Sequence, residues 1–443
     1  MKRIDPETAK GVEDYLPAQA TLKKNLIQTI SAVCERHGFE YLETPILENI
    51  TTLKTAESDF RIFNALTGED DAWDTGLRFD LTVPLARVVA MHWNDLSKPF
   101  KRYQVGEVFR GEKPQKGRLR QFTQFDCDIV GTQNKDADVS LLLLARNVFD
   151  ELKLGQKATL HINSKEYFYA LQDVLKISDE TLEELVKLFD KKAKISAEEC
   201  EQSLVALITD SAGQEVCRKI LNHTPSEDFE TMLSYLSSNT LVNIYDNGGR
   251  LEKLRDEFAA LEDVLSNNEA STSFVFNPTI ARGFGYYTGM VCEVIIDGFN
   301  FSVLGGGRYD KLTERFSPQN FPAVGISFGV DRILIVLNEL GLTLTPIQKT
   351  HVVVGYINES ARAYAFSVLT GLDAYKDSIA SEMYIGDQID ARSILMYALA
   401  KQATHMVVVG EDEMENSNVT VKNLAAKEQT TIPVDVLESY LRG

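Results

Sequence analysis

The stretch RYQVGEVFRGEKPQKGRLRQFTQFDCD, residues 102–128, consists of two alternating segments joined by a basic loop. Apolar and polar residues alternate before and after the loop, over 102–110 and 121–130, as they do in strands with one buried face. Pro114 and Gly117 provide turn residues between the two segments. The stretch therefore predicts a hairpin within an antiparallel sheet.

The loop of this hairpin is cationic, and the strand after it carries amide and carboxylate groups. Cations on a loop between paired strands suit a phosphate or a nucleic acid, although a solvated basic hairpin is the commoner alternative. Gln124, Asp126 and Asp128 share one sheet face by their spacing of two. Aligned carboxylates are costly to bury unless they meet a cation or a donor, which favours a binding site. The loop cations are Lys113, Lys116, Arg118 and Arg120.

Periodicity away from the hairpin predicts a sheet that is interrupted by a helical block. Apolar spacings of three and four predict a helix over 21–37, which Gly38 would end. Strands are expected at 39–42, 77–83, 274–276, 291–296 and 301–304, with helices between about 164 and 265. Ser178 is expected to cap one of these helices. The helical block is thus expected to be an insertion between two parts of one domain.

The C-terminal part has a different pattern. A linker containing Pro346 is expected after Leu340. Beyond the linker, an apolar strand at 351–355, a helix at 359–372 and a second apolar strand at 406–409 follow one another. Alternating strands and helices predict a small α/β domain.

Three glycine-containing segments are candidates for ligand contact. In ARGFGYYTG, residues 281–289, two adjacent tyrosines on an extended chain would point to opposite faces, or the segment is a structural turn. In LGGGRYD, residues 304–310, a glycine triplet permits close approach of a ligand, although a plain loop is its commoner meaning. In AVGISFGVDRIL, residues 323–334, a strand enters a helix. A cation at this helix start, Arg332, is disfavoured by the helix dipole unless an anion is bound.

These segments together resemble the signature motifs of class II aminoacyl-tRNA synthetases, and more narrowly those of histidyl-tRNA synthetases. The segments TPILE (44–48), FRGE (109–112) and GVDR (329–332) are similar to the three motifs of the class. RGFGYYTG (282–289), GGGRYD (305–310) and the opening GVEDYLP (11–17) are similar to segments of the histidine-specific family. The family usually has aspartate where this chain has Gly285, so a carboxylate beside the pocket is missing.

The resemblance implies an α+β fold and a ligase activity. A class II antiparallel-sheet catalytic domain is expected in residues 1–163 and 266–340, a helical insertion in 164–265, and an anticodon-binding α/β domain in 349–443. The implied reaction activates L-histidine with ATP and Mg²⁺ and attaches it to tRNA(His). The family also implies a homodimer.

The resemblance further assigns roles to particular residues. The catalytic pair next to the α-phosphate would be Arg110 and Arg282. The histidine site would comprise Asp80, Thr82, Arg110, Gln124, Asp128, Arg282, Tyr286, Tyr287 and Tyr309. The ATP site would comprise Arg110, Glu112, Arg118, Phe122 and Arg332. The acceptor end of tRNA would meet Lys113 and Gln115.

Composition sets limits on these expectations. The formal charge of −19 argues against a nucleic-acid partner taken alone, but a local basic patch can coexist with an acidic remainder. The five cysteines lack metal-ligand spacing and are expected to be reduced thiols, so no metal ligated by the protein is expected. No apolar run is long enough to span a membrane and the N-terminus lacks a signal-peptide core, so a cytoplasmic protein is expected.

Two rival functions share these features. One is the regulatory subunit of ATP phosphoribosyltransferase, a non-catalytic relative of the same catalytic fold. That relative lacks the C-terminal domain, whereas this chain has both that domain and the phosphate-facing arginines. The other rival is a class II ligase for another amino acid, or one that uses an acceptor other than tRNA.

Overall fold

The computed structural model describes residues 5–54, 62–65, 74–114, 117–192, 195–224, 228–237, 249–267, 270–281, 283–342, 344, 350–375, 378–401 and 403–442. The chain divides into two compact units, Met1–Leu152 with Asp310–Gly443, and Lys153–Tyr309. Among the described residues, no helix has the length and apolar character needed to cross a membrane.

The first unit contains the predicted hairpin. Strands β5 (Phe100–Phe109) and β6 (Gln121–Val130) pair antiparallel, and β11 (Ala323–Gly329) pairs antiparallel with the other edge of β6. The short β1 (Glu40–Tyr41) lies parallel to β5. The prediction of antiparallel strands in this stretch is confirmed. The alternation that predicted them places Phe125 against Tyr103, with ring centroids 5.5 Å apart, on the apolar face.

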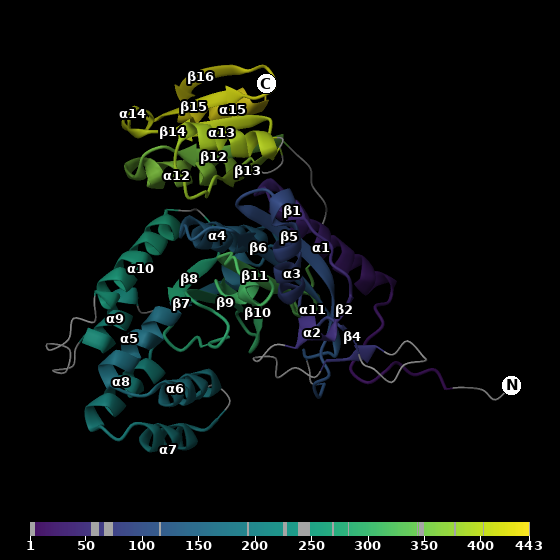
Figure 1. The fold of residues 1–443 in the computed structure, drawn as a ribbon, viewed down its shortest axis with the longest axis vertical. Coiled ribbons are helices and arrows are strands. Elements are labelled where there is room, and N and C mark those ends of the chain that lie inside the picture. Colours follow the sequence, from purple (N-terminus) through teal and green to yellow (C-terminus); the bar gives the residue numbers. More distant parts are fainter. Residues whose placement is uncertain are drawn as a thin grey trace. The chain divides into compact units, whose positions relative to one another are not determined.

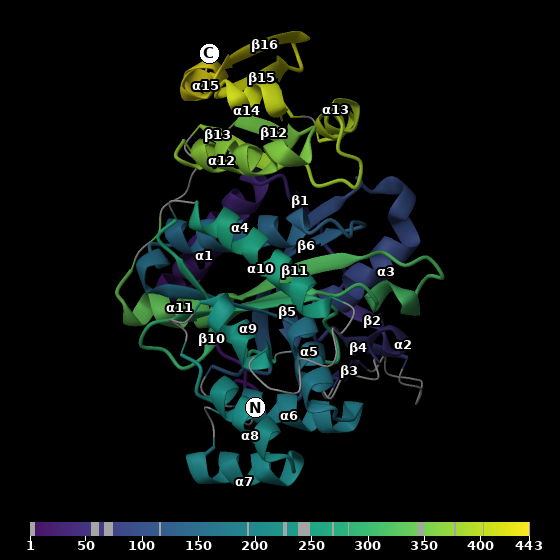
Figure 2. The same cartoon turned by 90° about the vertical axis from the view of Figure 1, so that its left-hand side faces the viewer.

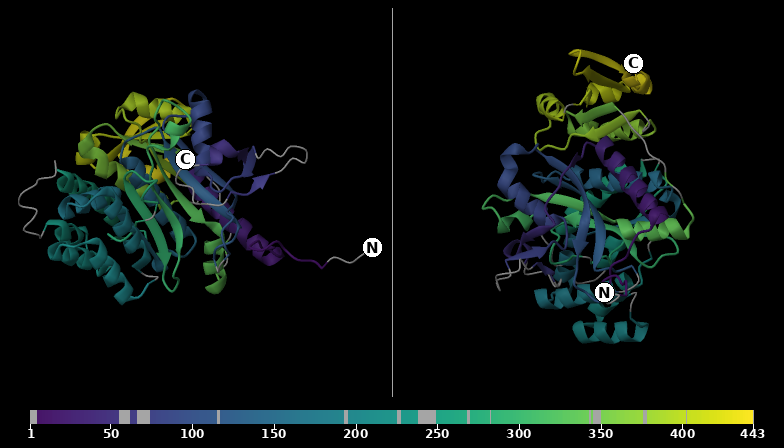
Figure 3. Two further views of the ribbon diagram at one scale, coloured as in Figure 1. Left: turned by 60° about the horizontal axis from the view of Figure 1, so that its bottom comes forward. Right: turned by 90° about the vertical axis from the view of Figure 1, so that its right-hand side faces the viewer.

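Helices bury the apolar face of these strands. Helix α1 (Pro17–Arg36) packs against α4 (Asp136–Glu151), α11 (Val330–Glu339) and β5, and Figure 3 shows it in purple. Its buried residues include Leu26, Ile30 and Val33, which confirms the helix predicted at 21–37. Cys34 of α1 and Cys127 of β6 are buried free thiols whose sulfur atoms lie 3.3 Å apart.

A small sheet and one helix flank this core. Strands β2 (Leu47–Asn49), β4 (Thr75–Leu77) and β3 (Asn64–Ala65) form the sheet, and α2 (Ile50–Leu53) follows β2. The strand expected at 77–83 is wrong, because β4 ends at Leu77 and helix α3 (Thr82–His92) begins at Thr82. The physical reason is local: the Asp80 carboxylate accepts a hydrogen bond from Val83 N at 3.1 Å, and Pro84 suits a first helical turn.

The C-terminal part of this unit is an α/β domain, as predicted (Figure 2). Its strand order is β13-β12-β14-β15-β16, with the first three strands parallel and the last two antiparallel to their neighbours. The strands are β12 (Thr350–Tyr356), β13 (Ile379–Met383), β14 (His405–Val409), β15 (Asn418–Asn423) and β16 (Glu428–Pro433). The helices are α12 (Arg362–Asp373), α13 (Ala391–Ala400), α14 (Glu411–Glu415) and α15 (Leu437–Arg442). Pro346 of the expected linker lies outside the described residues.

The second unit combines a four-stranded sheet with a helical block (Figure 1). The strands are β7 (Ala158–Ser164), β8 (Ser273–Phe276), β9 (Met290–Ile296) and β10 (Ser302–Arg308). The helices are α5 (Lys165–Leu175), α6 (Asp179–Lys191), α7 (Ala197–Leu207), α8 (Ser211–Leu221), α9 (Phe229–Ser237) and α10 (Arg250–Ser266). Ser178 caps α6 as predicted, since its Oγ accepts from Thr181 N at 3.3 Å. The expected domain limits stay predictions.

Short 3-10 helices complete the described secondary structure. They span Trp93–Asp95, Gly155–Lys157, Leu312–Arg315, Glu359–Ala361 and Val434–Val436.

Candidate active site

The polar face of strands β5, β6 and β11 carries candidate ligand-contacting side chains, and we call it the binding floor. Gln124, Asp126 and Asp128 point to this face, while Phe125 and Cys127 point to the helices behind it. The positions of β11 opposite these three polar residues are occupied only by small residues. They are Gly329 opposite Gln124, Ser327 opposite Asp126 and Gly325 opposite Asp128. Small neighbours on β11 place no large side chain directly beside these polar residues.

A buried ion pair anchors one end of this floor. Arg102 on β5 lies directly across from Asp128, and its Nη2 lies 2.7 Å from Asp128 Oδ2. The same guanidinium donates to Leu81 O at 3.3 Å, and both members of the pair are buried. Asp128 was predicted as a site residue, whereas Arg102 was not. The available signal was its place near the start of the hairpin strand. Arg102 lies two residues before Gln104 and so shares a face of the strand with it.

Asp126 is a second residue that the site prediction missed. Its side chain is 2% exposed, and its Oδ1 has no hydrogen-bond partner among the described residues. Burial raises the pKa of Asp126 to about 7, the charges of Asp128 and Asp80 raise it further, and Arg102 opposes them. A hydrogen bond from Ser327 also acts on this carboxylate and lowers its pKa. A buried carboxylate oxygen without a partner suggests a binding role.

Asp80 brings a third acid to the same place. It precedes α3, whose first residue is the predicted Thr82, and it is partly buried near the charges of Arg110 and Arg102. Burial raises the pKa of Asp80 to about 6, although backbone hydrogen bonds and these arginines oppose the shift. The floor therefore combines three carboxylates with two guanidinium groups, a charge balance that suits a cationic ligand.

Arg110 lies at the far end of β5, where the hairpin loop begins. Its Nε donates to Phe79 O at 3.1 Å, and its guanidinium carbon lies 5.0 Å from the centre of the Phe122 ring. Arg110 thus covers one face of Phe122 by a cation–π contact. The structure brings these two predicted nucleotide-site residues together.

The loop residues are more exposed. Arg118 Nη1 lies 3.8 Å from Glu112 Oε2, with the two side chains 61% and 39% exposed. Lys113 is also exposed, whereas Gln115 lies outside the described residues. Groups this accessible are available to a soluble ligand, and their mutual pairing contributes little stability.

Arg332 reaches the same loop from helix α11. Its Nε donates to Gly117 O at 3.3 Å. The neighbouring Asp331 fixes the helix start, because it accepts hydrogen bonds from Thr123 N at 2.6 Å and Tyr15 Oη at 2.7 Å. An acid in the first turn suits the helix dipole, while Arg332 there opposes it. An anionic ligand near the loop would offset that cost.

The predicted aromatic residues lie in the second unit. Tyr286 and Tyr287 lie at a turn, and their rings meet edge to face with centroids 5.1 Å apart. The expectation of opposite faces on an extended chain is therefore wrong, because Tyr286 N and Tyr287 N both bond Gly283 O and close the turn. Tyr309 stacks on Tyr286 at 5.3 Å. Arg282 lies outside the described residues.

Glycines shape the surroundings of Tyr287. The glycine triplet lies within strand β10 and is not a loop. A Cβ on Gly307 would lie 2.9 Å from the Tyr287 ring and 2.4 Å from Met290 O. Gly283 has a φ of +62°, and a Cβ there would lie 2.6 Å from the same ring. These two positions need glycine because Tyr287 occupies the space that a side chain would fill.

Comparisons with known proteins relate the whole chain to one family. Residues 11–333 match the family model described as histidyl-tRNA synthetase, and residues 351–443 match that of an anticodon binding domain. A histidine–tRNA ligase of Wolinella succinogenes is 35% identical over 99% of both chains. The structure of a histidyl-tRNA synthetase from Nostoc superposes with a TM-score of 0.64 at 26% identity, over 99% of this chain and 100% of that one.

A third likeness concerns the fold alone. A Bacillus halodurans structure, described as an ATP phosphoribosyltransferase regulatory subunit/histidyl-tRNA synthetase, is 21% identical. It covers 92% of this chain and 99% of its own, with a TM-score of 0.64. The family model spans most of the chain, and the curated relative matches from end to end. The chain therefore belongs to the histidyl-tRNA synthetase family of class II aminoacyl-tRNA ligases.

Proposed function

We propose that this protein activates L-histidine with ATP to form histidyl-adenylate and then transfers the histidyl group to the 3′ end of tRNA(His). The observation that carries the proposal is the acidic floor, formed by the buried Asp126 and Asp128 and the partly buried Asp80, with Arg110 close to Asp80. Such a floor suits a substrate with a cationic amine and an imidazole. Arg110 suits the phosphate that must approach the carboxylate of that substrate.

Amino-acid recognition would use the hydrogen-bond acceptors of the floor. The amide of Gln124 is oriented by Ser327, since its Nε2 donates to Ser327 Oγ at 2.9 Å. Its Oε1 has no partner among the described residues and can accept from an ammonium group. Asp80 and Thr82 would complete the amine site. Asp128 and Tyr287 would bind the two imidazole nitrogens, with Tyr286 and Tyr309 lining the pocket.

Adenylation needs alignment more than it needs a base. A substrate carboxylate oxygen forms a bond to the α-phosphorus while the bond to pyrophosphate breaks, and the carboxylate is already ionised at neutral pH. Arg110 and Arg282 would contact both the α-phosphate and the substrate carboxylate. A preorganised cation of this kind contributes on the order of 3 kcal/mol to the transition state. Arg118 and Arg332 would hold the γ-phosphate.

The adenine and the metal complete the nucleotide site. Phe122 would stack on the adenine ring, and Glu112 would meet its edge. In the part of the chain that the structure describes, no cluster of three or more His, Cys, Asp or Glu residues could hold a metal ion. Mg²⁺ would therefore be held chiefly by phosphate oxygens and water, which is how this ion usually binds nucleotides. Its role would be to neutralise charge on the phosphates.

In the transfer step, a terminal ribose hydroxyl of tRNA attacks the aminoacyl carbonyl and forms an ester bond. The bond from that carbonyl carbon to the phosphate oxygen breaks, and AMP and the hydroxyl proton leave. Lys113, exposed on the hairpin loop, and Gln115 would meet the acceptor end. The C-terminal domain would contact the anticodon, as the match to an anticodon-binding domain supports.

Family resemblance also implies a homodimer and a cytoplasmic location, and both stay predictions. Exposed apolar residues support self-association. Tyr41, Ile46 and Leu47, in and beside the TPILE segment, are 52%, 44% and 53% exposed. Light scattering on the purified protein would test for the dimer.

The regulatory alternative is less well supported. A regulator would not need a cation beside the acidic floor, nor the C-terminal domain that residues 351–443 match. Pyrophosphate exchange with a panel of amino acids, followed by charging of transcribed tRNA, separates the candidates. We expect exchange with histidine alone and charging of tRNA(His) alone. Exchange without charging would indicate a ligase with another acceptor, and no exchange would indicate the regulator.

A variant links the assay to the site. Arg110→Ala should lower the rate constant for exchange by about 10²–10³ fold, as loss of a preorganised donor does. Arg255→Ala is the control, because that arginine pairs with Glu230 on the surface of the other unit, half exposed. Exchange at the wild-type rate in Arg110→Ala would refute the role of Arg110.

A further inference from the structure

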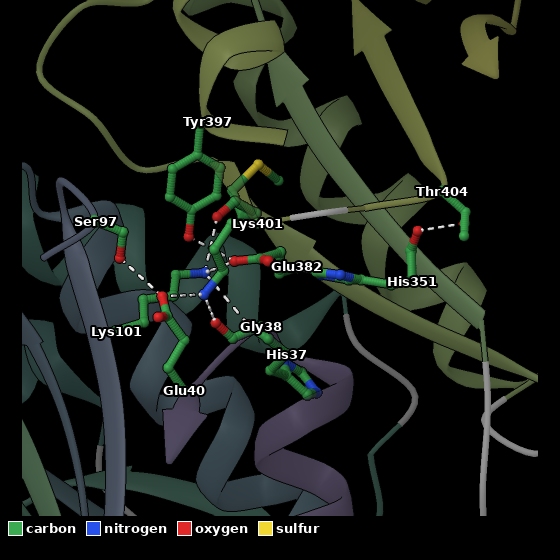
Figure 4. A network of polar contacts seen from close by, with 11 residues as sticks. His37, Gly38, Glu40, Ser97, Lys101, His351, Glu382, Tyr397, Lys401 and Thr404 are labelled. Atoms are coloured by element: carbon green, nitrogen blue, oxygen red, sulfur yellow. Dashed lines mark hydrogen bonds and ion pairs between the residues drawn. The ribbon is translucent and has the colours of Figure 1, made fainter. Parts of the chain in front are cut away.

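A buried ion pair joins the strand that carries Arg102 to the C-terminal domain. Lys101 on β5 and Glu382 on β13 are 1% and 0% exposed, and Lys101 Nζ lies 2.9 Å from Glu382 Oε2 (Figure 4). The two residues are 281 positions apart in the chain. A fully buried pair of opposite charges across a domain boundary is costly to desolvate, so its geometry needs other support.

Both charges have that support. Lys101 Nζ also donates to Met383 O at 3.0 Å and His37 O at 3.4 Å, which gives each of its three protons an acceptor. Glu382 accepts from Tyr397 Oη at 2.7 Å, and its second oxygen lies 2.8 Å from His351 Nε2. Figure 4 shows these groups converging on the Glu382 carboxylate. Both buried charges therefore have the hydrogen-bond partners that a buried ion pair needs.

The turn after α1 is fitted to the same carboxylate. Gly38 has a φ of +77°, and a Cβ built there would lie 1.9 Å from Glu382. Lys401 of the C-terminal domain donates to Gly38 O and lies 3.1 Å from Glu40 Oε1. Lys401 and Glu382 of the C-terminal domain therefore both contact the turn at Gly38. Together they hold β5 and the end of α1 in place.

The pair also lies next to the binding floor in sequence. Lys101 and Arg102 are consecutive on β5, so their side chains leave the strand on opposite faces. Arg102 is the partner of Asp128 on the floor. A shift of the strand at Lys101 must move Arg102 and, through the 2.7 Å contact, the carboxylate of Asp128.

We propose that Lys101 is a positioning residue, which uses its contact with Glu382 to make the geometry of the Arg102–Asp128 pair depend on the seating of the C-terminal domain. The side of the molecule that receives the anticodon would thereby set amino-acid affinity. This inference rests on the proposed function in naming histidine as the ligand of the floor and the anticodon as the ligand of the C-terminal domain.

A matched control exists at the same domain boundary. Asp136, which begins α4, accepts hydrogen bonds from Arg362 and Tyr356 of the C-terminal domain. This contact is also buried on the Asp136 side, but Asp136 lies beyond the end of β6 and beside no predicted site residue. Asp136 therefore contacts the same domain from helix α4 and not from strand β5. A pure docking role for Lys101 would make the two contacts equivalent.

The first experiment compares Glu382→Gln and Lys101→Met with Arg362→Met in pyrophosphate exchange. We expect the first two variants to raise the KM for histidine about tenfold, with the KM for ATP and the kcat little changed. Arg362→Met should lower the melting temperature and leave the KM for histidine unchanged. An equal rise in all three variants, or no rise in the first two, would overturn the proposal.

A second experiment needs no substrate and keeps the test valid if a variant loses activity or the proposed function fails. Hydrogen exchange of the ligand-free protein would follow the amides of residues 101–106 and 124–129. We expect faster exchange there in Glu382→Gln and wild-type protection in Arg362→Met. Wild-type protection of these amides in both variants would refute the coupling. If the wild-type protein showed no histidine-dependent pyrophosphate exchange, only the proposed function would be refuted.

Discussion

The domain boundary and the binding floor both contain acidic side chains removed from solvent, but their pKa values shift in opposite directions. At the domain boundary, burial acts to raise the pKa of Glu382, but Lys101, Lys401 and His351 outweigh it and hold that pKa well below its usual range. On the binding floor, burial wins, and it raises the pKa of Asp80 to about 6 and that of Asp126 to about 7. The carboxylate of Glu382 is paired within the protein, whereas Asp126 keeps one oxygen without a partner among the described residues. This contrast indicates a structural role for Glu382 and makes Asp126 a candidate for ligand contact.

The largest expected effect breaks the satisfied cluster. Glu382→Leu would leave Lys101 buried without its partner and should lower the free energy of unfolding by about 3–5 kcal/mol. The double variant Lys101→Met with Glu382→Leu should recover most of that loss, because neither charge remains. Urea denaturation monitored by circular dichroism measures both. A loss below about 1 kcal/mol in the single variant would contradict the comparison.

The opposite result is expected on the floor. Asp126 has a folded-state pKa above its unfolded value, so the stability it contributes is present below about pH 4 and is lost as the pH rises through about 7. Asp126→Asn should therefore gain stability relative to the wild type as the pH rises from 4 to 8, on the order of 2 kcal/mol. It should also bind histidine more weakly at pH 8. Melting curves and exchange kinetics over that range test both, and a destabilised variant at pH 8 would refute the assignment.

A histidine at the domain boundary, His37, is expected to lower the stability of the protein as the pH falls. Burial, together with Arg36 and Lys101, lowers the pKa of His37 to about 3. The unfolded state therefore takes up a proton near pH 6.5 that the folded state refuses, and stability falls as the pH falls from about 6.5 to 3. His37→Gln should flatten this part of the stability curve by up to about 1–3 kcal/mol. An unchanged slope of melting temperature against pH would count against the buried neutral imidazole.

The smallest effect on stability is expected at the exposed loop. Arg118 is 61% exposed and its carboxylate partner Glu112 is 39% exposed, so Arg118→Ala should change the free energy of unfolding by less than about 1 kcal/mol. If Arg118 contacts the γ-phosphate, the KM for ATP should nevertheless rise severalfold. Exchange kinetics at varied ATP would show it. A large loss of stability would mean that the loop has a packing role.

Local patterns were enough to predict the hairpin and the helix α6, but not the segment that carries Asp80 and Thr82. Alternation predicted the hairpin because one of its faces is apolar, and Ser178 announced its helix by its capping chemistry. The segment at 77–83 failed for the same kind of reason. Its apolar residues suggested a strand, while the cap supplied by Asp80 and the turn residue Pro84 began a helix.

Charge partners lay beyond what local patterns can show. The period of two placed Asp126 on the polar face, but only the fold shows that its Oδ1 lacks a partner. Lys101 and Glu382 carry no local signal, because each is an ordinary charged residue until two domains bring them together. The tyrosines of the second unit were identified by motif, whereas the turn that orients them depends on the carbonyl of Gly283.

The missing side chain at Gly38 has a consequence for exchanging modules between relatives. The notch that it leaves is filled by a carboxylate from β13, since a Cβ would stand 1.9 Å from Glu382. A transplanted C-terminal domain without an acid at that position would leave the Lys101 ammonium buried without a counter-charge, and the space beside Gly38 would be unfilled. A chimera should therefore fold well only when the catalytic part has Gly38 and Lys101 and the transplanted C-terminal domain has a glutamate at the position of Glu382.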